Sequence, residues 1–198
     1  MDNDTVKRSI ENYLVTVAQK DPKKTIQAQA IGMLGKYKKT EYKTLFMKAV
    51  NDSSYSVAGK ALEALGLIDD ATAADEAKKL SILPAKGTLK EALFAYTDES
   101  KFDSVASVFR NLPFGNAKFF MVSGFASFLG RVKNTNNLEK GVDMIVKFRD
   151  TIPQQFRGNT DPFINGALKG IKEKKDASGL KEQAEYIKSK LPAEKPQP

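Results

Sequence analysis

The strongest constraint on the fold is an internal repeat with a step of 31 residues. The segment DPKKTIQAQAIGMLG at residues 21–35 returns as DSSYSVAGKALEALG at residues 52–66. A weaker third copy follows one more step along the chain, where GTLKEALFAYT keeps the small residue and its apolar neighbours but lacks the glycine. A repeat of this length holds two antiparallel helices and two turns, which is the unit of a helical solenoid. The pairs that recur in register are Ile26 with Val57, Ala30 with Ala61, Ile31 with Leu62, Leu34 with Leu65, and Gly35 with Gly66.

Apolar residues recur at spacings of three and four along the chain, which predicts about eleven helices and no strand. Asp4 is the expected N-cap of the first helix. Its apolar stripe, which needs a partner helix, consists of Val6, Ile10, Tyr13, Leu14 and Val17. Four later helices have the expected apolar faces Tyr42, Leu45, Phe46, Ala49 and Val50; Ala71, Ala74, Ala77 and Leu80; Leu89, Ala92, Leu93 and Tyr96; and Phe102, Val105, Val108 and Phe109.

Aspartate and proline mark several expected helix starts. Asp21 followed by Pro22 predicts a cap with proline at the first helical position. We also expect N-caps at Asp69 or Asp70 and at Asp98.

The C-terminal third contains breaks as well as helices. Residues 151–163, TIPQQFRGNTDPF, hold two prolines and a glycine, and we expect a structured loop or a broken turn there. Phe163, Ile164, Ala167, Leu168 and Ile171 form the expected face of the helix that follows. The last helix is expected to begin near Asp176 and to carry Leu180, Ala184, Ile187 and Leu191.

The most apolar helix is expected within NAKFFMVSGFASFLG, residues 116–130. Its large side chains cover more than one side of the helix, so it either lies at the centre of the fold or exposes a docking face. We favour the core, because helices that are apolar all round are normally buried. These side chains are Phe119, Phe120, Val122, Phe125, Phe128 and Leu129.

Together these patterns predict an all-α fold, a right-handed α-α superhelix of HEAT/ARM-like repeats with about eleven antiparallel helices. We expect one helical-repeat domain over residues 1–192. Its clearest repeats are 21–50, 52–81 and 83–112, with more irregular helices over 116–192 and a short tail at 193–198.

Composition removes several kinds of chemistry. The chain has no cysteine and no histidine, so it has no thiolate nucleophile, no disulfide, and neither the commonest general base nor the commonest zinc ligand. No signal peptide is recognisable at the N-terminus, and no window approaches the length of apolar chain that crosses a bilayer. We therefore expect a soluble protein without membrane insertion, and the compartment stays open.

The net charge of +8 invites a nucleic-acid interpretation, but its distribution weakens that interpretation. The surplus is spread along the chain, and residues 51–100 are net acidic. Lys36, Lys38, Lys39 and Lys43 are better explained as a solvated helix face or turn than as a phosphate-binding track. Tryptophan is absent and the other aromatic residues fall on apolar stripes, so stacking platforms for single strands are not evident. Nucleic acid is therefore an unfavoured partner.

A search for catalytic motifs gives only weak candidates. Ser178 and Lys181 match a Ser-x-x-Lys pattern, but the companion motifs of that enzyme class are absent, and helix capping by Asp176 or Ser178 explains them better. The neighbours Asp69-Asp70 and Asp98-Glu99 could hold a metal or transfer protons, yet their places at helix starts explain them as charges that complement the helix dipole. We predict no catalytic, cofactor-binding or metal-ligating residue in this chain.

Three stretches carry a family resemblance: VAGKALEALGLID at 57–69, LKEALFAYTDESKFDSVASVFRNLP at 89–113, and NTDPFINGALKGIKEKKD at 159–176. With the phenylalanine-rich helix between the last two, their texture and order resemble the C-terminal HEAT-like helical region of M1-family zinc aminopeptidases. The likeness covers about residues 21–191. The zinc-binding His-Glu-x-x-His helix and the Gly-x-Met-Glu-Asn loop of that family do not occur here, so no catalytic residue is transferred.

The resemblance implies a non-catalytic domain of a larger hydrolase. Such a domain packs on the catalytic domain of the same parent chain, which holds the zinc, and walls the chamber through which peptide substrates enter. Met1 would then not be a natural start. This fragment itself would be no enzyme and would hold no cofactor.

Two alternatives stay open. A free-standing HEAT-like adaptor for a protein partner needs only the solenoid. A basic HEAT-like nucleic-acid-binding protein, such as a HEAT-like DNA glycosylase, would use the lysine surplus on its concave face.

Overall fold

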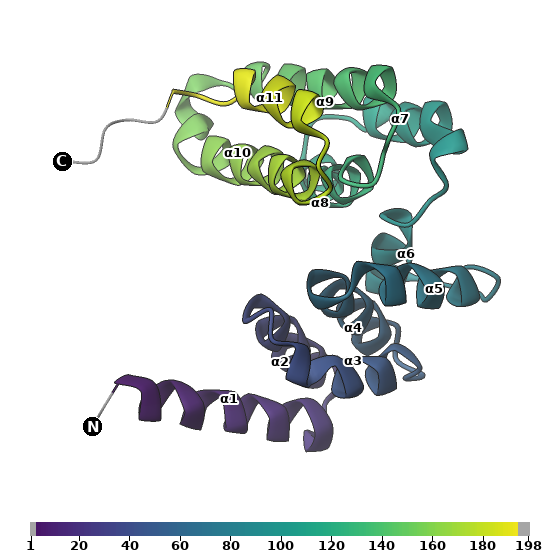
Figure 1. Ribbon diagram of the computed structural model, residues 1–198, viewed down its shortest axis with the longest axis vertical. Coiled ribbons are helices and arrows are strands. Elements are labelled where there is room, and N and C mark those ends of the chain that lie inside the picture. Colours follow the sequence, from purple (N-terminus) through teal and green to yellow (C-terminus); the bar gives the residue numbers. More distant parts are fainter. Residues whose placement is uncertain (1–2, 194–198) are drawn as a thin grey trace. The chain divides into compact units, whose positions relative to one another are not determined.

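The computed structural model describes residues 3–193, and within this range every regular element is a helix (Figure 1). The prediction of an all-α fold with eleven α-helices is confirmed, and the fold is consistent with an α-α superhelix. Residues 194–198 of the predicted tail lie outside the described range. The α-helices are α1 (Asn3–Lys20), α2 (Lys24–Lys36), α3 (Lys43–Val50), α4 (Tyr55–Ile68), α5 (Asp70–Leu80), α6 (Gly87–Phe94), α7 (Phe102–Asn111), α8 (Asn116–Leu129), α9 (Thr135–Asp150), α10 (Gln154–Ala177) and α11 (Lys181–Ser189). Two short 3-10 helices, η1 (Thr40–Tyr42) and η2 (Glu99–Lys101), precede α3 and α7.

The chain divides into two compact units, residues 1–96 and 97–198. The boundary falls inside the third predicted repeat, 83–112, so that α6 belongs to the first unit and α7 to the second. That residues 1–192 act as one domain stays a prediction. Each unit is described separately below.

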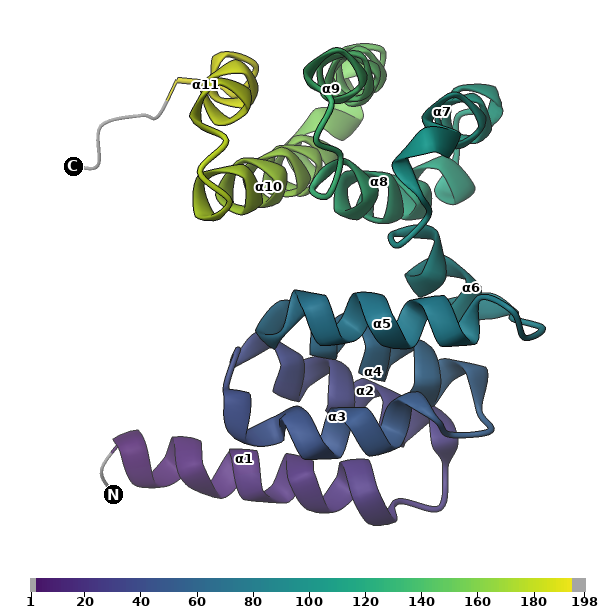
Figure 2. The same ribbon diagram turned by 45° about the vertical axis from the view of Figure 1, so that its right-hand side comes forward.

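The first unit consists of two layers of helices. Helix α2 packs on α4, and α4 packs on α6, which is the stacking expected from the 31-residue step. Helices α1, α3 and α5 form the second layer and pack on α2 and α4 (Figure 2). All three end at the same edge of the unit.

Two glycines let the repeat helices approach closely. A Cβ atom on Gly35 of α2 would lie 2.7 Å from the Cβ of Ala64 in α4. A Cβ on Gly59 of α4 would lie 2.5 Å from the carbonyl carbon of Thr88 at the start of α6. Because real Cβ atoms do not come this close to other heavy atoms, the spacing of these helices depends on glycine.

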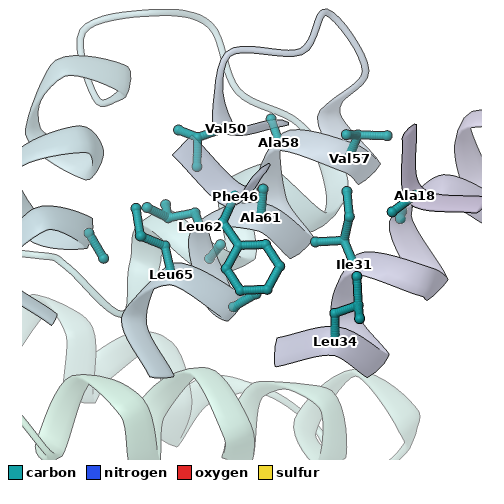
Figure 3. Close-up of a cluster of buried hydrophobic side chains, with 14 of the residues drawn as sticks. Ala18, Ile31, Leu34, Phe46, Val50, Val57, Ala58, Ala61, Leu62 and Leu65 are labelled. Carbon is teal, nitrogen blue, oxygen red and sulfur yellow. The ribbon is translucent and has the colours of Figure 1, made fainter. Parts of the chain in front are cut away.

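The core of the first unit is built from the recurring apolar positions (Figure 3). Ile31 and Leu34 of α2 meet Leu62 and Leu65 of α4, with the ring of Phe46 from α3 between the layers, and all five are fully buried. Burial of each such side chain contributes about 1.5–3 kcal/mol. The recurring apolar residues of α2 and α4 are therefore buried as predicted, with one exception given below.

Polar side chains link successive repeats of this unit within each layer. The Lys39 amine and the Tyr42 hydroxyl each donate to Oε2 of Glu11, at 2.5 Å. The Lys39 amine and the Tyr42 hydroxyl hold the pKa of the Glu11 carboxyl below its usual value. Lys24 donates to Asp52 at 2.7 Å, and this pair joins the start of α2 to the start of α4.

The second unit also has two layers. Helices α8 and α10 pack on each other, while α7, α9 and α11 lie in the other layer (Figure 2). Fully buried side chains fill the space between the layers, among them Val122, Phe125, Leu138, Ile145, Ile164 and Leu168.

Several predicted apolar stripes are wrong in register. In α1, Leu14 is buried, but Val6, Ile10 and Tyr13 are exposed, and Glu11 takes an inward place. Ile26 is exposed, because α2 begins only at Lys24 and Gln27 turns inward to donate its amide to the carbonyl of Asp21 at 2.6 Å.

The helix α5 was predicted with a face of period three, whereas a helix repeats every 3.6 residues. Its buried residues are Ala73, Glu76, Ala77 and Leu80, so the predicted burial of Ala71 and Ala74 is wrong. Val108 of α7 is likewise exposed, while Phe102, Val105 and Phe109 are buried as predicted.

Two expected helix starts differ in the structure. Asp4 lies inside the first turn of α1 rather than at its N-cap. Pro22 precedes α2, and the Asp21 carboxylate instead accepts the backbone N–H of Lys23 at 2.8 Å.

The predicted loop at 151–163 is wrong, because most of it forms the first turns of α10. Pro153 lies at the N-cap, where its missing N–H costs nothing. Pro162 lies inside the helix. Because proline has no backbone N–H, the carbonyl of Gly158 lacks its usual helical donor. Since Gly158 is exposed, water can satisfy that carbonyl.

The last helix starts later than predicted. Asp176 lies in the last turn of α10 and pairs with Lys172 at 2.6 Å, and α11 begins at Lys181. Gly179, with φ +73°, ends α10, and the N–H of Leu180 bonds back to the carbonyl of Lys175.

Candidate functional site

A chain of phenylalanine rings leads from the core of the second unit to its surface. Phe109 stacks on Phe125 with ring centroids 4.6 Å apart, and Phe148 meets Phe109 edge-on at 6.2 Å. Phe119 contacts Phe148 at 5.1 Å, and Phe114 contacts Phe119 at 5.8 Å. Aromatic pairs at such distances stabilise each other beyond their burial alone, so the inner rings hold the outer rings in place.

The outer end of this ring cluster borders a groove between α8 and α10. The groove has a volume of about 320 Å³ and is lined by Phe119, Phe120 and Ser123 from α8 and by Asn159, Thr160 and Phe163 from α10. We call it the aromatic groove. Phe120 is 75% exposed and Phe163 43% exposed, although both are large apolar side chains. None of the six lining residues is charged.

Lys118 supports the base of α8 beside the ring cluster. Its amine lies 5.4 Å from the ring centre of Phe109 and 5.5 Å from that of Phe148. The same amine donates to the carbonyls of Leu112 at 2.9 Å and Arg110 at 3.2 Å. Burial lowers the pKa of this lysine. The Lys118 amine therefore makes its contacts within the second unit, where it joins the end of α7 to the start of α8.

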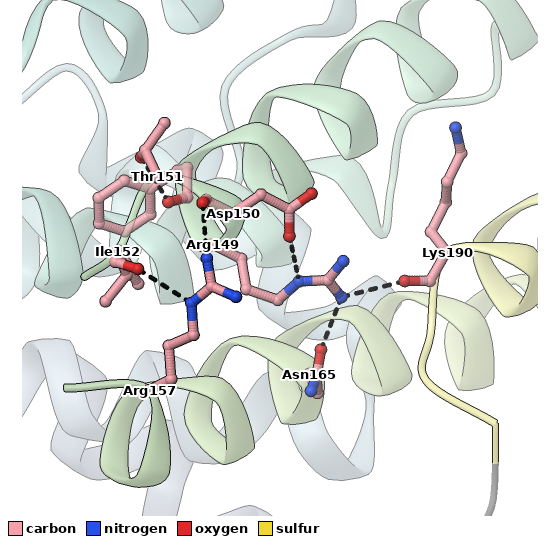
Figure 4. Close-up of polar contacts among 8 residues, drawn as sticks. Arg149, Asp150, Thr151, Ile152, Arg157, Asn165 and Lys190 are labelled. Atoms are coloured by element: carbon pink, nitrogen blue, oxygen red, sulfur yellow. Dashed lines mark hydrogen bonds and ion pairs between the residues drawn. The ribbon is translucent and has the colours of Figure 1, made fainter. Parts of the chain in front are cut away.

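Two arginines fix the half of α10 that carries the groove (Figure 4). Arg157, in the first turn of α10, donates to the carbonyls of Asp150 at the end of α9 and of Ile152 just after it, both at 2.9 Å. Arg149 of α9 donates to Oδ1 of Asn165 at 2.9 Å and to the carbonyl of Lys190 at 3.0 Å. These contacts hold α10 against α9 and the end of α11.

The two residues of the Ser-x-x-Lys pattern lie at the junction of α10 and α11. Ser178 is the C-cap of α10, and Lys181 is the first residue of α11. Both residues are exposed. The expected capping by Asp176 or Ser178 is also wrong, because α11 has no side-chain cap and Leu180 precedes it.

The acidic pairs act largely as the dipole interpretation predicts. Asp69 caps α5, accepting from the N–H of Thr72 at 3.0 Å, and it also binds the Lys43 amine at 2.6 Å. Lys43 and Thr72 hold the pKa of Asp69 far below its usual value. Asp98 accepts the N–H of Ser100 at 2.8 Å and caps η2.

Glu99 has a role that the sequence did not indicate. Its two carboxylate oxygens accept the backbone N–H groups of Lys133 and Asn134, at 2.8 and 2.7 Å. It therefore fixes the connection between α8 and α9 rather than forming a site with Asp98. Within residues 3–193, no group of three or more acidic side chains is arranged to hold a metal ion.

The four lysines predicted as a solvated face do not share one role. Lys36 and Lys38 are exposed. Lys39 binds Glu11 and Lys43 binds Asp69, so these two join successive helices. In the described part of the chain, no helix is long and apolar enough to cross a bilayer.

The two-layer stacking of the first unit agrees with the comparison to known families. Residues 11–95 match the HEAT repeats. This part of the chain is a HEAT-like helical domain. The match covers α2 to α6 entirely, together with the second half of α1.

Searches of curated proteins and of solved structures give no significant match. None of these comparisons links the chain to an M1 aminopeptidase.

Sequence reasoning missed the aromatic groove but contained a sign of it. The helix over 116–130 was apolar on more than one side, and exposure of a docking face was the less favoured alternative. The structure shows a buried and an exposed side of α8: Val122, Phe125, Phe128 and Leu129 are buried, whereas Phe120 is exposed. The contribution of Asn159 and Phe163 could not be seen, because their segment was predicted to be a loop or its exit.

Proposed function

We propose that this chain is a non-catalytic helical-repeat scaffold that binds another protein, and that the aromatic groove is a contact surface for that partner. The match to HEAT repeats and the all-helical fold support the scaffold. The observation that carries the contact surface is the exposure of Phe120 and Phe163 beside an uncharged groove.

The energetics favour a protein partner at this groove. Covering an exposed phenylalanine contributes about 1.5–3 kcal/mol, and aromatic side chains in a pocket are frequent centres of binding energy. Ser123, Asn159 and Thr160 add polar groups that orient a ligand without selecting a charge. An amphipathic helix of the partner, laid into the groove with its apolar side, fits this lining.

The test is a pair of serine substitutions at the groove. The full chain serves as bait in quantitative affinity capture, and each captured protein is then purified and titrated against the bait by calorimetry. Phe120→Ser combined with Phe163→Ser should lower the affinity for the purified partner by about tenfold or more. Val108→Ser is the matched control, because Val108 is 48% exposed in the same unit and lies outside the groove lining. A partner that binds all variants equally would contradict the proposed contact surface.

A second proposal gives the scaffold a specific parent. The resemblance of residues 57–69, 89–113 and 159–176 to the C-terminal region of M1 zinc aminopeptidases supports it. In that case the chain packs on a zinc-bearing catalytic domain and walls the peptide chamber. The reading frame upstream of Met1 would then encode a His-Glu-x-x-His helix, and its absence would exclude this parent.

We also propose that the chain alone has no peptidase activity. It lacks histidine and cysteine, and so lacks the zinc ligands of that family. The purified chain should not hydrolyse aminoacyl-p-nitroanilides. Turnover that a chelator abolishes would refute the proposal.

A further inference from the structure

A second surface of interest is the edge of the first unit at which α1, α3 and α5 end and α2, α4 and α6 begin (Figure 2). We call it the basic edge. The Lys24–Asp52 pair joins two of its connections, and the contact of Gly59 with the start of α6 brings the third alongside. The three connections therefore form one continuous border.

Lysines outnumber acidic residues along this border. Lys20, Lys48 and Lys78 lie in the last turns of α1, α3 and α5, and Lys23, Lys86 and Lys90 lie at the starts of α2 and α6. All six are exposed, and none forms an ion pair within residues 3–193. The aspartates of the border are already used: Asp21 accepts the N–H of Lys23, and Asp52 binds Lys24 and the N–H of Ser54.

Helix dipoles explain only half of these lysines. Cations in a last turn are stabilised by the negative end of the helix, so Lys20, Lys48 and Lys78 need no further reason. At a helix start the same dipole repels a cation, and neither α2 nor α6 has an acidic residue in its first turn. Lys23, Lys86 and Lys90 are therefore placed against the local electrostatics, which indicates a use outside the fold.

The border also exposes apolar side chains among the lysines. Ile82 is 84% exposed and Leu83 56% exposed in the connection between α5 and α6, and Tyr55 is 38% exposed at the start of α4. The side chains of Ile82 and Leu83 can form neither a hydrogen bond nor an ion pair with a sugar-phosphate backbone. The cations of the connections and helix ends named here are lysines, which lack the bidentate geometry with which arginine recognises phosphate.

We propose that the basic edge binds a protein segment rich in glutamate or aspartate and interspersed with large apolar residues. The lysines attract the carboxylates, and Ile82 and Leu83 bury the apolar side chains of the segment. This inference concerns a different unit from the aromatic groove and does not depend on it.

The experiment uses the full chain and a fluorescent peptide of repeated Glu-Glu-Leu triplets, followed by anisotropy at low salt. The expected result is binding that weakens as salt is added. Lys23→Glu combined with Lys86→Glu should lower the affinity by about tenfold, since each removes one attraction and adds one repulsion. Lys140→Glu with Lys147→Glu is the matched control, because both lysines are exposed and lie in the second unit. It should change the affinity by less than about twofold.

Two further measurements separate the contributions. Ile82→Ser with Leu83→Ser should weaken the Glu-Glu-Leu peptide but leave the weaker binding of an all-glutamate peptide unchanged. The charge-reversed variant should keep or raise its melting temperature, because glutamate at a helix start is favoured by the dipole. A loss of binding therefore cannot be attributed to unfolding.

Three outcomes would overturn the inference. The first is no binding of the acidic peptide at low salt, and the second is an equal loss in the control variant. The third is a single-stranded oligonucleotide that binds more tightly than the peptide and depends on the same lysines, which would assign the edge to nucleic acid. Loss of binding in the groove variant alone would leave this proposal intact.

Discussion

Lys175 is the most unusual residue of the second unit, because it is a lysine with only 1% of its surface exposed. Its amine donates to the carbonyl of Val132 in the connection between α8 and α9. Burial lowers its pKa from 10.5 to about 8. The folded state therefore releases this proton more easily than the unfolded chain does.

The stability contributed by Lys175 should rise with pH between about 8 and 10.5. In that window the unfolded chain binds the proton and the folded chain does not, so alkali favours the folded state. Relative to Lys175→Met, the free energy of unfolding of the wild type should increase by about 2 kcal/mol across the window. Urea unfolding followed by circular dichroism at several pH values measures the difference between the two proteins. The titration of the other lysines is common to both proteins and cancels in this difference. Parallel curves for the two proteins would contradict it.

Single residues were predictable where their chemistry is local. The caps at Asp69 and Asp98 follow from the few residues around them. The pairing of Asp69 with Lys43 does not, because it depends on how α5 packs beside α3. The burial of Lys175 could not be predicted for the same reason. It lies in the charged segment EKKD, which is typical of an exposed helix end.

At the level of helices, the 31-residue step was the reliable signal. It anticipated the stacking of α2, α4 and α6, because recurring small and apolar residues must fill recurring contacts. Proline was the misleading signal. Pro153 and Pro162 suggested a break, whereas Arg157 secures the first turns of α10 through contacts that no local pattern reveals.

Glycines inside helices should respond oppositely to alanine according to their surroundings. Gly59→Ala should destabilise the first unit by about 1–3 kcal/mol, because the new Cβ meets the backbone of Thr88. Gly166→Ala should stabilise the second by about 0.5–1 kcal/mol, since nothing lies within 4 Å of its Cβ position. Thermal unfolding of both variants measures the effects, and equal shifts of the same sign would disprove the packing described for α4 and α6.

At the scale of the whole molecule, all-α architecture was predictable from periodicity, and the division into two units was not. The unit boundary at residues 96 and 97 falls within a predicted repeat, where the apolar pattern continues without a linker signal. The aromatic groove was equally out of reach, because it forms only when α8 and α10 lie side by side.

The first unit should fold without the second. It has its own hydrophobic core, from Leu14 in α1 to Ala92 in α6. A fragment of residues 1–96 should therefore be helical and unfold cooperatively on heating. Circular dichroism and calorimetry test this expectation, and a fragment without a cooperative transition would show that the core is insufficient alone.

The concealment of the Lys175 amine gives the second unit a built-in chemical reporter. Reagents that acylate lysine should modify the exposed amines quickly and reach this one only when α10 opens away from the α8–α9 connection. Mass spectrometry of the peptide that contains it would then time that opening without any added probe.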